Sequence, residues 1–64
     1  VYQDLNVWRN VMLMAELHGV PRAKRTREGE RLLELLGLSE RKKRKARALS
    51  KGLRQRLMLY MPSE

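Results

Sequence analysis

The chain has 64 residues, no cysteine and a formal net charge of +8 at pH 7. This length allows one domain at most, because a chain of this size buries only about 60% of the surface that its unfolded state exposes. The composition excludes a disulfide framework, and the single histidine, His18, cannot hold a metal ion alone. A stand-alone domain this small usually needs a staple, so we expect a fragment of a larger protein. Its strong positive charge favours an anionic partner.

A first helix is predicted over residues 6–18. Asn6 is placed at its N-cap, and Gly19 follows where a left-handed C-terminal cap belongs. The helix is apolar on nearly every side, and such a helix needs covering layers on more than one side. Either some of its methionines are exposed beside a small core, or one face of the helix is made for another domain or subunit.

A second helix is predicted over residues 21–36. Pro21 lies in its first turn, where a missing N–H loses no partner, and Gly37 is placed as its C-terminal cap. Leu32, Leu33 and Leu36 lie on one side of this segment, as in an ordinary amphipathic helix. Gly29 lies where an apolar residue is more usual, and glycine costs about 1 kcal/mol against alanine inside a helix.

A short third helix is predicted over residues 39–46, with Ser39 as a candidate N-cap. A last helix is predicted over residues 50–61, with Ser50 as its cap. No apolar run alternates with the period of a strand. We therefore expect an all-α fold, a small bundle of three to four short helices within a single domain that spans residues 1–64.

The segment 48–57 carries the clearest chemical signal. Ser50 caps a helix whose first turn contains Lys51 and Gly52, and the predicted helix contains no acidic residue. Bare N–H groups at a helix start, a hydroxyl, a glycine that allows close approach and added positive charge together make a candidate phosphate site. An ordinary serine cap before a solvated basic turn explains the same residues, and on physical grounds alone it is the simpler interpretation.

This segment resembles the signature motif of the ATP-binding cassette (ABC) ATPases, whose general form is Leu-Ser-Gly-Gly-x-x-x-Arg. Three upstream segments are similar to the same family at suitable spacing, namely residues 4–11, 15–21 and 32–38. The resemblance covers nearly the whole chain. It implies the ABC-specific helical subdomain that carries the signature loop, without the ATP-binding core.

In this family two ATPase domains form a head-to-tail dimer, and the signature loop of one domain faces the γ-phosphate of ATP bound to the other. The resemblance implies that Ser50 donates its hydroxyl to this phosphate, and that backbone N–H groups of Lys51 and Gly52 complete the cradle. Gln55 and Arg56 match motif positions that support the loop and the domain interface, and no phosphate contact is assigned to them.

ATP with its magnesium ion would be held by the parent or partner domain. The sequence has no Gly-x-x-x-x-Gly-Lys-Ser/Thr loop and no strand that ends in Asp-Glu. We therefore expect no catalytic residue, no metal site and no ATP hydrolysis in this chain alone, whereas the parent protein would be an ATPase that drives transport. The implied partners are the rest of the ABC ATPase domain, a second ATPase domain and a transmembrane subunit or domain, on the cytoplasmic side of the membrane.

The sequence also departs from the family pattern. Lys51 replaces the usual first glycine of the motif, which restricts the loop backbone but adds charge. Arg9 lies where the family often has glutamate, and the Ala-Arg-Ala run expected after Leu57 is absent.

The densest block of charge is residues 41–47, which holds six of the chain's lysines and arginines. Such runs often bind nucleic acid, so a small basic helical nucleic-acid-binding module is the alternative function. No aromatic residue is interleaved for base stacking, and such a module has no use for the signature loop. Non-specific nucleic-acid binding in vitro is expected in either case.

Overall fold

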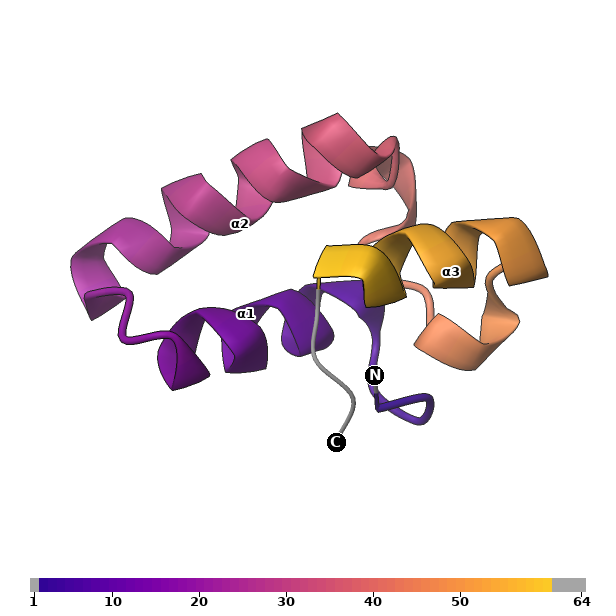
Figure 1. Cartoon of the computed structure of the whole chain (residues 1–64), viewed down its shortest axis with the longest axis horizontal. Coiled ribbons are helices and arrows are strands. Elements are labelled where there is room, and N and C mark those ends of the chain that lie inside the picture. The colour runs from indigo at the N-terminus through magenta and orange to yellow at the C-terminus, as the bar shows by residue number, and fades with distance from the viewer. Residues whose placement is uncertain (1, 61–64) are drawn as a thin grey trace.

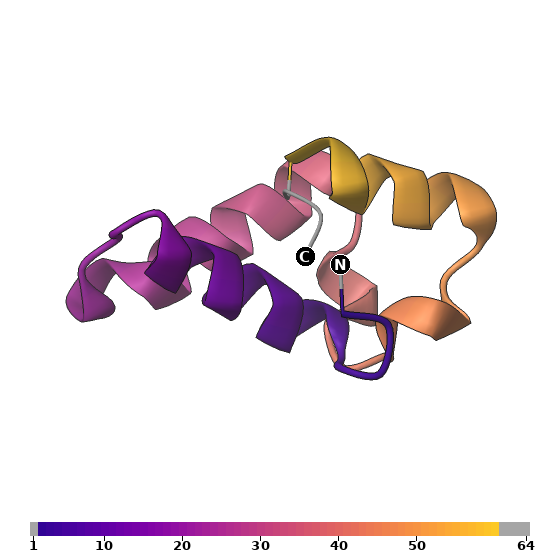
Figure 2. The same ribbon diagram turned by 60° about the horizontal axis from the view of Figure 1, so that its bottom comes forward.

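The computed structural model describes residues 2–60, and it is built from helices and helical turns (Figure 1). The elements in chain order are α1 (Val7–Leu17), α2 (Arg22–Leu36), the 3-10 turns η1 (Ser39–Arg41) and η2 (Ala46–Ala48), and α3 (Lys51–Tyr60). α1 and α2 form an antiparallel hairpin, and α3 lies over the end of the hairpin that is farther from its turn (Figure 2). The expected all-α small bundle is confirmed.

The ends of the helices follow the local signals of the sequence. Asn6 caps α1, since its side-chain oxygen accepts the N–H of Arg9 at 2.6 Å. Gly19 and Gly37 have φ angles of 76° and 72°, the left-handed conformation that glycine adopts without strain after a helix. Pro21 lies at the N-cap of α2, one residue before the position that we expected.

The first N–H groups of α1 find partners far away in the sequence. The N–H of Val7 donates to the carbonyl of Arg44 at 2.8 Å, and the N–H of Trp8 donates to the carbonyl of Lys42 at 2.9 Å. A helix cannot satisfy its own first N–H groups, so they need such outside acceptors. The connector between α2 and α3 therefore caps α1.

The buried side chain of Asn10 holds the N-terminal segment against α1. Its amide nitrogen donates to the carbonyls of Tyr2 at 3.0 Å, Leu5 at 3.3 Å and Asn6 at 3.0 Å, and its oxygen accepts the N–H of Tyr2 at 2.7 Å. The side chain is fully buried. One amide thus satisfies four backbone bonds and fixes the fold of residues 2–6.

The predicted helix over residues 39–46 is wrong. The chain forms the 3-10 turn η1, then runs without a helix to η2, and the N–H of Ala46 donates to the carbonyl of Leu5 at 2.9 Å. Asn6 and Lys45 form an isolated antiparallel bridge. A continuous helix would use these backbone groups internally, and the N-terminal segment would lose its partners. Ser39 lies inside η1 and is not its cap.

The core lies between the hairpin and α3. Its buried residues are Val7, Val11, Leu33, Leu36, Leu38, Leu49 and Leu57. Gly29 is buried, and a Cβ atom there would overlap the Met12 methyl group and lie 3.2 Å from the Trp8 ring. The cost of this glycine inside a helix is therefore offset by close packing of α1 on α2.

α3 ends at Tyr60 in the described part of the chain, so residue 61 of the predicted last helix lies outside it. Among residues 2–60, no helix has both the length and the apolar character that a membrane crossing requires.

Replacement of Asn10 by alanine tests the role of its amide. We expect Asn10→Ala to lower the free energy of unfolding by roughly 2 kcal/mol, because the N–H of Tyr2 and several part-buried carbonyls lose their partner. The exposed Gln3→Ala is the control and should change it by less than about 0.5 kcal/mol. Urea unfolding followed by circular dichroism gives both values. Equal stability of the two variants would show that Asn10 does not hold the segment.

Candidate functional site

The loop before α3 is held between two buried leucines. Leu49 precedes it with 5% of its surface exposed, and Leu57 lies two turns into α3 and is fully buried. Between them, Ser50, Lys51 and Gly52 are exposed. The fold therefore fixes both flanks of the loop and presents its polar residues to solvent.

Ser50 caps α3 as its sequence predicts. Its side-chain oxygen accepts the N–H of Leu53 at 3.2 Å, and its carbonyl accepts the N–H of Arg54 at 2.9 Å. A hydroxyl has one proton to donate and two lone pairs to accept. The cap uses a lone pair, so the proton of Ser50 is left to donate to an anion.

The backbone at Lys51 and Gly52 opens the first turn of α3. N–H groups at this position have no preceding turn to bond, and the helix dipole gives them partial positive charge. α3 has no acidic residue in its first turn to balance that charge. Apart from the neighbouring backbone of α3, no atom lies within 4 Å of where a Cβ atom of Gly52 would be, so neither packing nor a positive φ requires glycine here. The glycine leaves open space in front of the helix start.

Gln55 and Arg56 lie farther along α3 than its first turn. Gln55 is exposed on α3. The Nη1 atom of Arg56 lies 3.6 Å from where a Cβ atom of Gly37 would be, at the C-terminal end of α2. Cations are favoured at helix C-termini, so Arg56 is placed to link α3 to the end of α2. Of the five predicted site residues, Ser50, Lys51 and Gly52 therefore form the exposed helix start, and Gln55 and Arg56 lie farther along α3.

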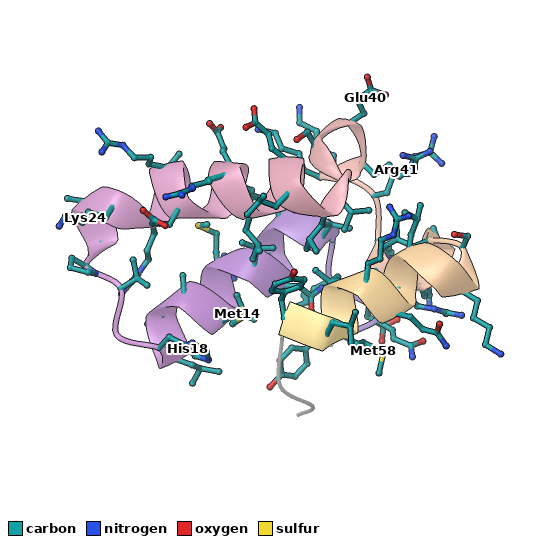
Figure 3. The ribbon with its side chains drawn as sticks, turned by 45° about the horizontal axis from the view of Figure 1, so that its top comes forward. Met14, His18, Lys24, Glu40, Arg41 and Met58 are labelled. Atoms are coloured by element: carbon teal, nitrogen blue, oxygen red, sulfur yellow. The ribbon has the colours of Figure 1, made fainter. Side chains whose placement is uncertain are left out.

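The basic segment 41–47 is divided between internal contacts and solvent. Lys42 lies 5.0 Å from the centroid of the Trp8 ring and 3.5 Å from the carboxylate of Glu30. Arg47 bonds Asp4 at 2.8 Å. The remaining cations of the run are exposed, namely Arg41, Lys43, Arg44 and Lys45. Arg41 points away from the body of the molecule (Figure 3).

His18 lies at the end of α1, remote from α3 (Figure 3). Within residues 2–60 no group of three or more histidine, cysteine, aspartate or glutamate side chains could hold a metal ion.

The sequence analysis predicted no role for Asn10, although a carboxamide inside an otherwise apolar helix is a signal for a buried polar contact.

Together, these features define a small all-α unit with an exposed, serine-capped basic helix start. The chain is 37% identical over 59 residues to an sn-glycerol-3-phosphate import ATP-binding protein of Agrobacterium fabrum. The match covers 92% of this chain and 16% of that protein. The chain is therefore related to an ABC transporter ATP-binding protein and spans a small part of that relative's length. No family model matches the chain, and no solved structure matches it.

The capping bond of Ser50 can be tested by stability alone. We expect Ser50→Ala to lower the free energy of unfolding by about 1 kcal/mol, because the N–H of Leu53 loses its acceptor. Ser50→Asp keeps an acceptor and suits the helix dipole, so it should stay close to the wild type. Urea unfolding of the variants measures the difference. If alanine and aspartate gave equal stabilities, Ser50 would not be the cap.

Proposed function

We propose that this chain is part of the ATP-binding protein of an ABC transporter, and that the start of α3 binds the γ-phosphate of ATP held by a second ATPase domain. The observation that carries the proposal is the exposed helix start with Ser50, Lys51 and Gly52 at its tip. The 37% identity to an ATP-binding protein over most of the chain adds independent support.

The chemistry of this half-site is electrostatic. As the phosphoryl group leaves ATP, negative charge is spread over its oxygens, and donors already in position stabilise that charge. Ser50 offers a hydroxyl proton, and the first turn of α3 offers N–H groups together with the positive end of its dipole. Lys51 adds a full positive charge where the family motif has glycine. This part of the protein needs no group that transfers a proton.

A division of labour follows from these residues. The parent or partner domain would hold MgATP through its own phosphate loop and carboxylates. This chain would contact the γ-phosphate from the opposite side. The hydrolysis would drive transport through a transmembrane subunit that the helical subdomain contacts on the cytoplasmic side of the membrane. Gln55 and Arg56 would support the loop and the domain interface.

A small nucleic-acid-binding module is the second candidate function. The four exposed cations of the 41–47 segment favour it, because clustered lysine and arginine release counterions from any polyanion. Contacts to phosphates of this kind carry no sequence information. The exposed cations are therefore expected to give general polyanion binding.

The proposal can be tested by grafting residues 1–61 into an intact ABC ATPase in place of its own helical subdomain. We expect the graft to hydrolyse ATP. A Gly52→Asp change in the graft should lower turnover about 10²–10³-fold, because a carboxylate would face the phosphate. Ser50→Ala should cost less, since the helix start remains. Steady-state phosphate release measures all three.

Two controls separate this effect from damage to the fold. Gly52→Ala adds a Cβ atom where no neighbour lies within 4 Å, so it should fold normally and lose less turnover than aspartate. Lys43→Asp changes the charge on the connector by two units, twice the change of Gly52→Asp, and should leave turnover nearly unchanged. Full turnover in the Gly52→Asp graft would refute the assignment of the loop.

The exposed cations of the 41–47 segment lead to a separate prediction about the binding of DNA. We expect weak, sequence-independent binding to duplex DNA, with log K falling against log salt with a slope of about −3 to −4 if all four exposed cations contact phosphates. The double variant Lys43→Gln/Arg44→Gln should make the slope shallower by about 2. Fluorescence anisotropy with two unrelated duplexes gives both numbers. Strong preference for one sequence that persists at high salt would instead favour the nucleic-acid module.

A further inference from the structure

A hollow of about 400 Å³ lies between α1 and the beginning of α2, away from the loop before α3. Three arginines from two helices line it: Arg9 from α1, and Arg22 and Arg25 from α2. Its volume is in the range of small-ligand pockets, which is about 300–1,000 Å³. Arginines from two separate helices line the same hollow, and this feature needs an explanation.

The charge of the hollow suits a doubly charged anion. Three arginines and one carboxylate, Glu16, line it, which leaves a formal excess of two positive charges. Arg25 is half-buried, and its Nε donates to the carbonyl of Val20 at 2.9 Å. This bond fixes the side chain of Arg25 and leaves the terminal N–H groups of its guanidinium to bind a ligand. The ion pairs Lys42–Glu30 and Arg47–Asp4 within residues 2–60 involve none of these arginines.

The rest of the lining selects among anions. Thr26 adds a hydroxyl, and Met12 and Leu13 supply a half-buried apolar wall. Guanidinium groups bind phosphate oxygens in pairs, and a phosphate presents several oxygens to several arginines at once. The first turn of α2 contains no acidic residue that would compete for them.

From these contacts we propose that the hollow binds a small phosphate monoester. The phosphate lies among Arg9, Arg22 and Arg25, and the organic group lies against Met12 and Leu13. This site goes beyond the proposed function, because it is separate from Ser50 and does not depend on a second ATPase domain.

The test is a titration of the 64-residue chain with phenyl phosphate and with inorganic phosphate at constant ionic strength, followed by calorimetry or backbone NMR. We expect saturable binding, with phenyl phosphate tighter than inorganic phosphate because its ring covers the apolar wall. Arg22→Gln and Arg9→Gln should each weaken binding about three- to tenfold. Both arginines are exposed, so these variants should keep the helical circular dichroism of the wild type.

Lys24→Gln is the matched control. Lys24, labelled in Figure 3, lies in the same first turn of α2 but is not part of the lining. Its loss removes the same charge and should change affinity by less than about twofold. The titration reads the hollow through Arg9 and Arg22, whereas the graft tests the γ-phosphate loop, so failure of one proposal is distinguishable from failure of the other.

Three results would overturn the proposal. Equal weakening by Lys24→Gln and Arg22→Gln would mean general attraction to a basic protein. Equal affinity for succinate would mean that the hollow does not select phosphate. Shifts that grow linearly with ligand and never saturate would mean that there is no site.

Discussion

The capping of α1 by a distant segment is the constraint on which the rest of the structure depends. The carbonyls of Lys42 and Arg44 accept the first N–H groups of α1, and the buried amide of Asn10 holds residues 2–6 beside them. These bonds fix the connector, and the connector leads through η2 to the start of α3. The position of Ser50 therefore depends on hydrogen bonds made at the far end of the chain.

The three helix starts differ in how their positive ends are balanced. None has an acidic residue in its first turn, although acidic residues are favoured there. α1 is covered by carbonyls of the connector, whereas α2 lacks a side-chain cap and α3 has the single hydroxyl of Ser50. Charge that a fold leaves unbalanced is available for a ligand. This difference is the physical basis of the γ-phosphate proposal, whereas the phosphate monoester proposal rests on the arginines that line the hollow.

The apolar character of α1 has two explanations in the structure. Val7 and Val11 are buried in the core, and Trp8 and Met12 close around Gly29 of α2. Leu17, in contrast, is 74% exposed at the end of the helix. The hairpin and α3 therefore cover most of the apolar side chains of α1, and Leu17 remains as exposed apolar surface.

The sequence by itself determined the features that depend on short-range chemistry. Asn6 and Ser50 accept N–H groups three residues ahead, and Gly19 and Gly37 take the left-handed angles that end a helix. The loop of the candidate site was predicted because a serine cap, a glycine and a basic first turn are all local. The connector was predicted wrongly, since its helical pattern was overridden by bonds to residues about 40 positions away. The packing of Gly29 against α1 and the arginine-lined hollow were likewise decided by the tertiary structure. Both depend on how closely two helices approach each other, and neither helix determines that distance alone.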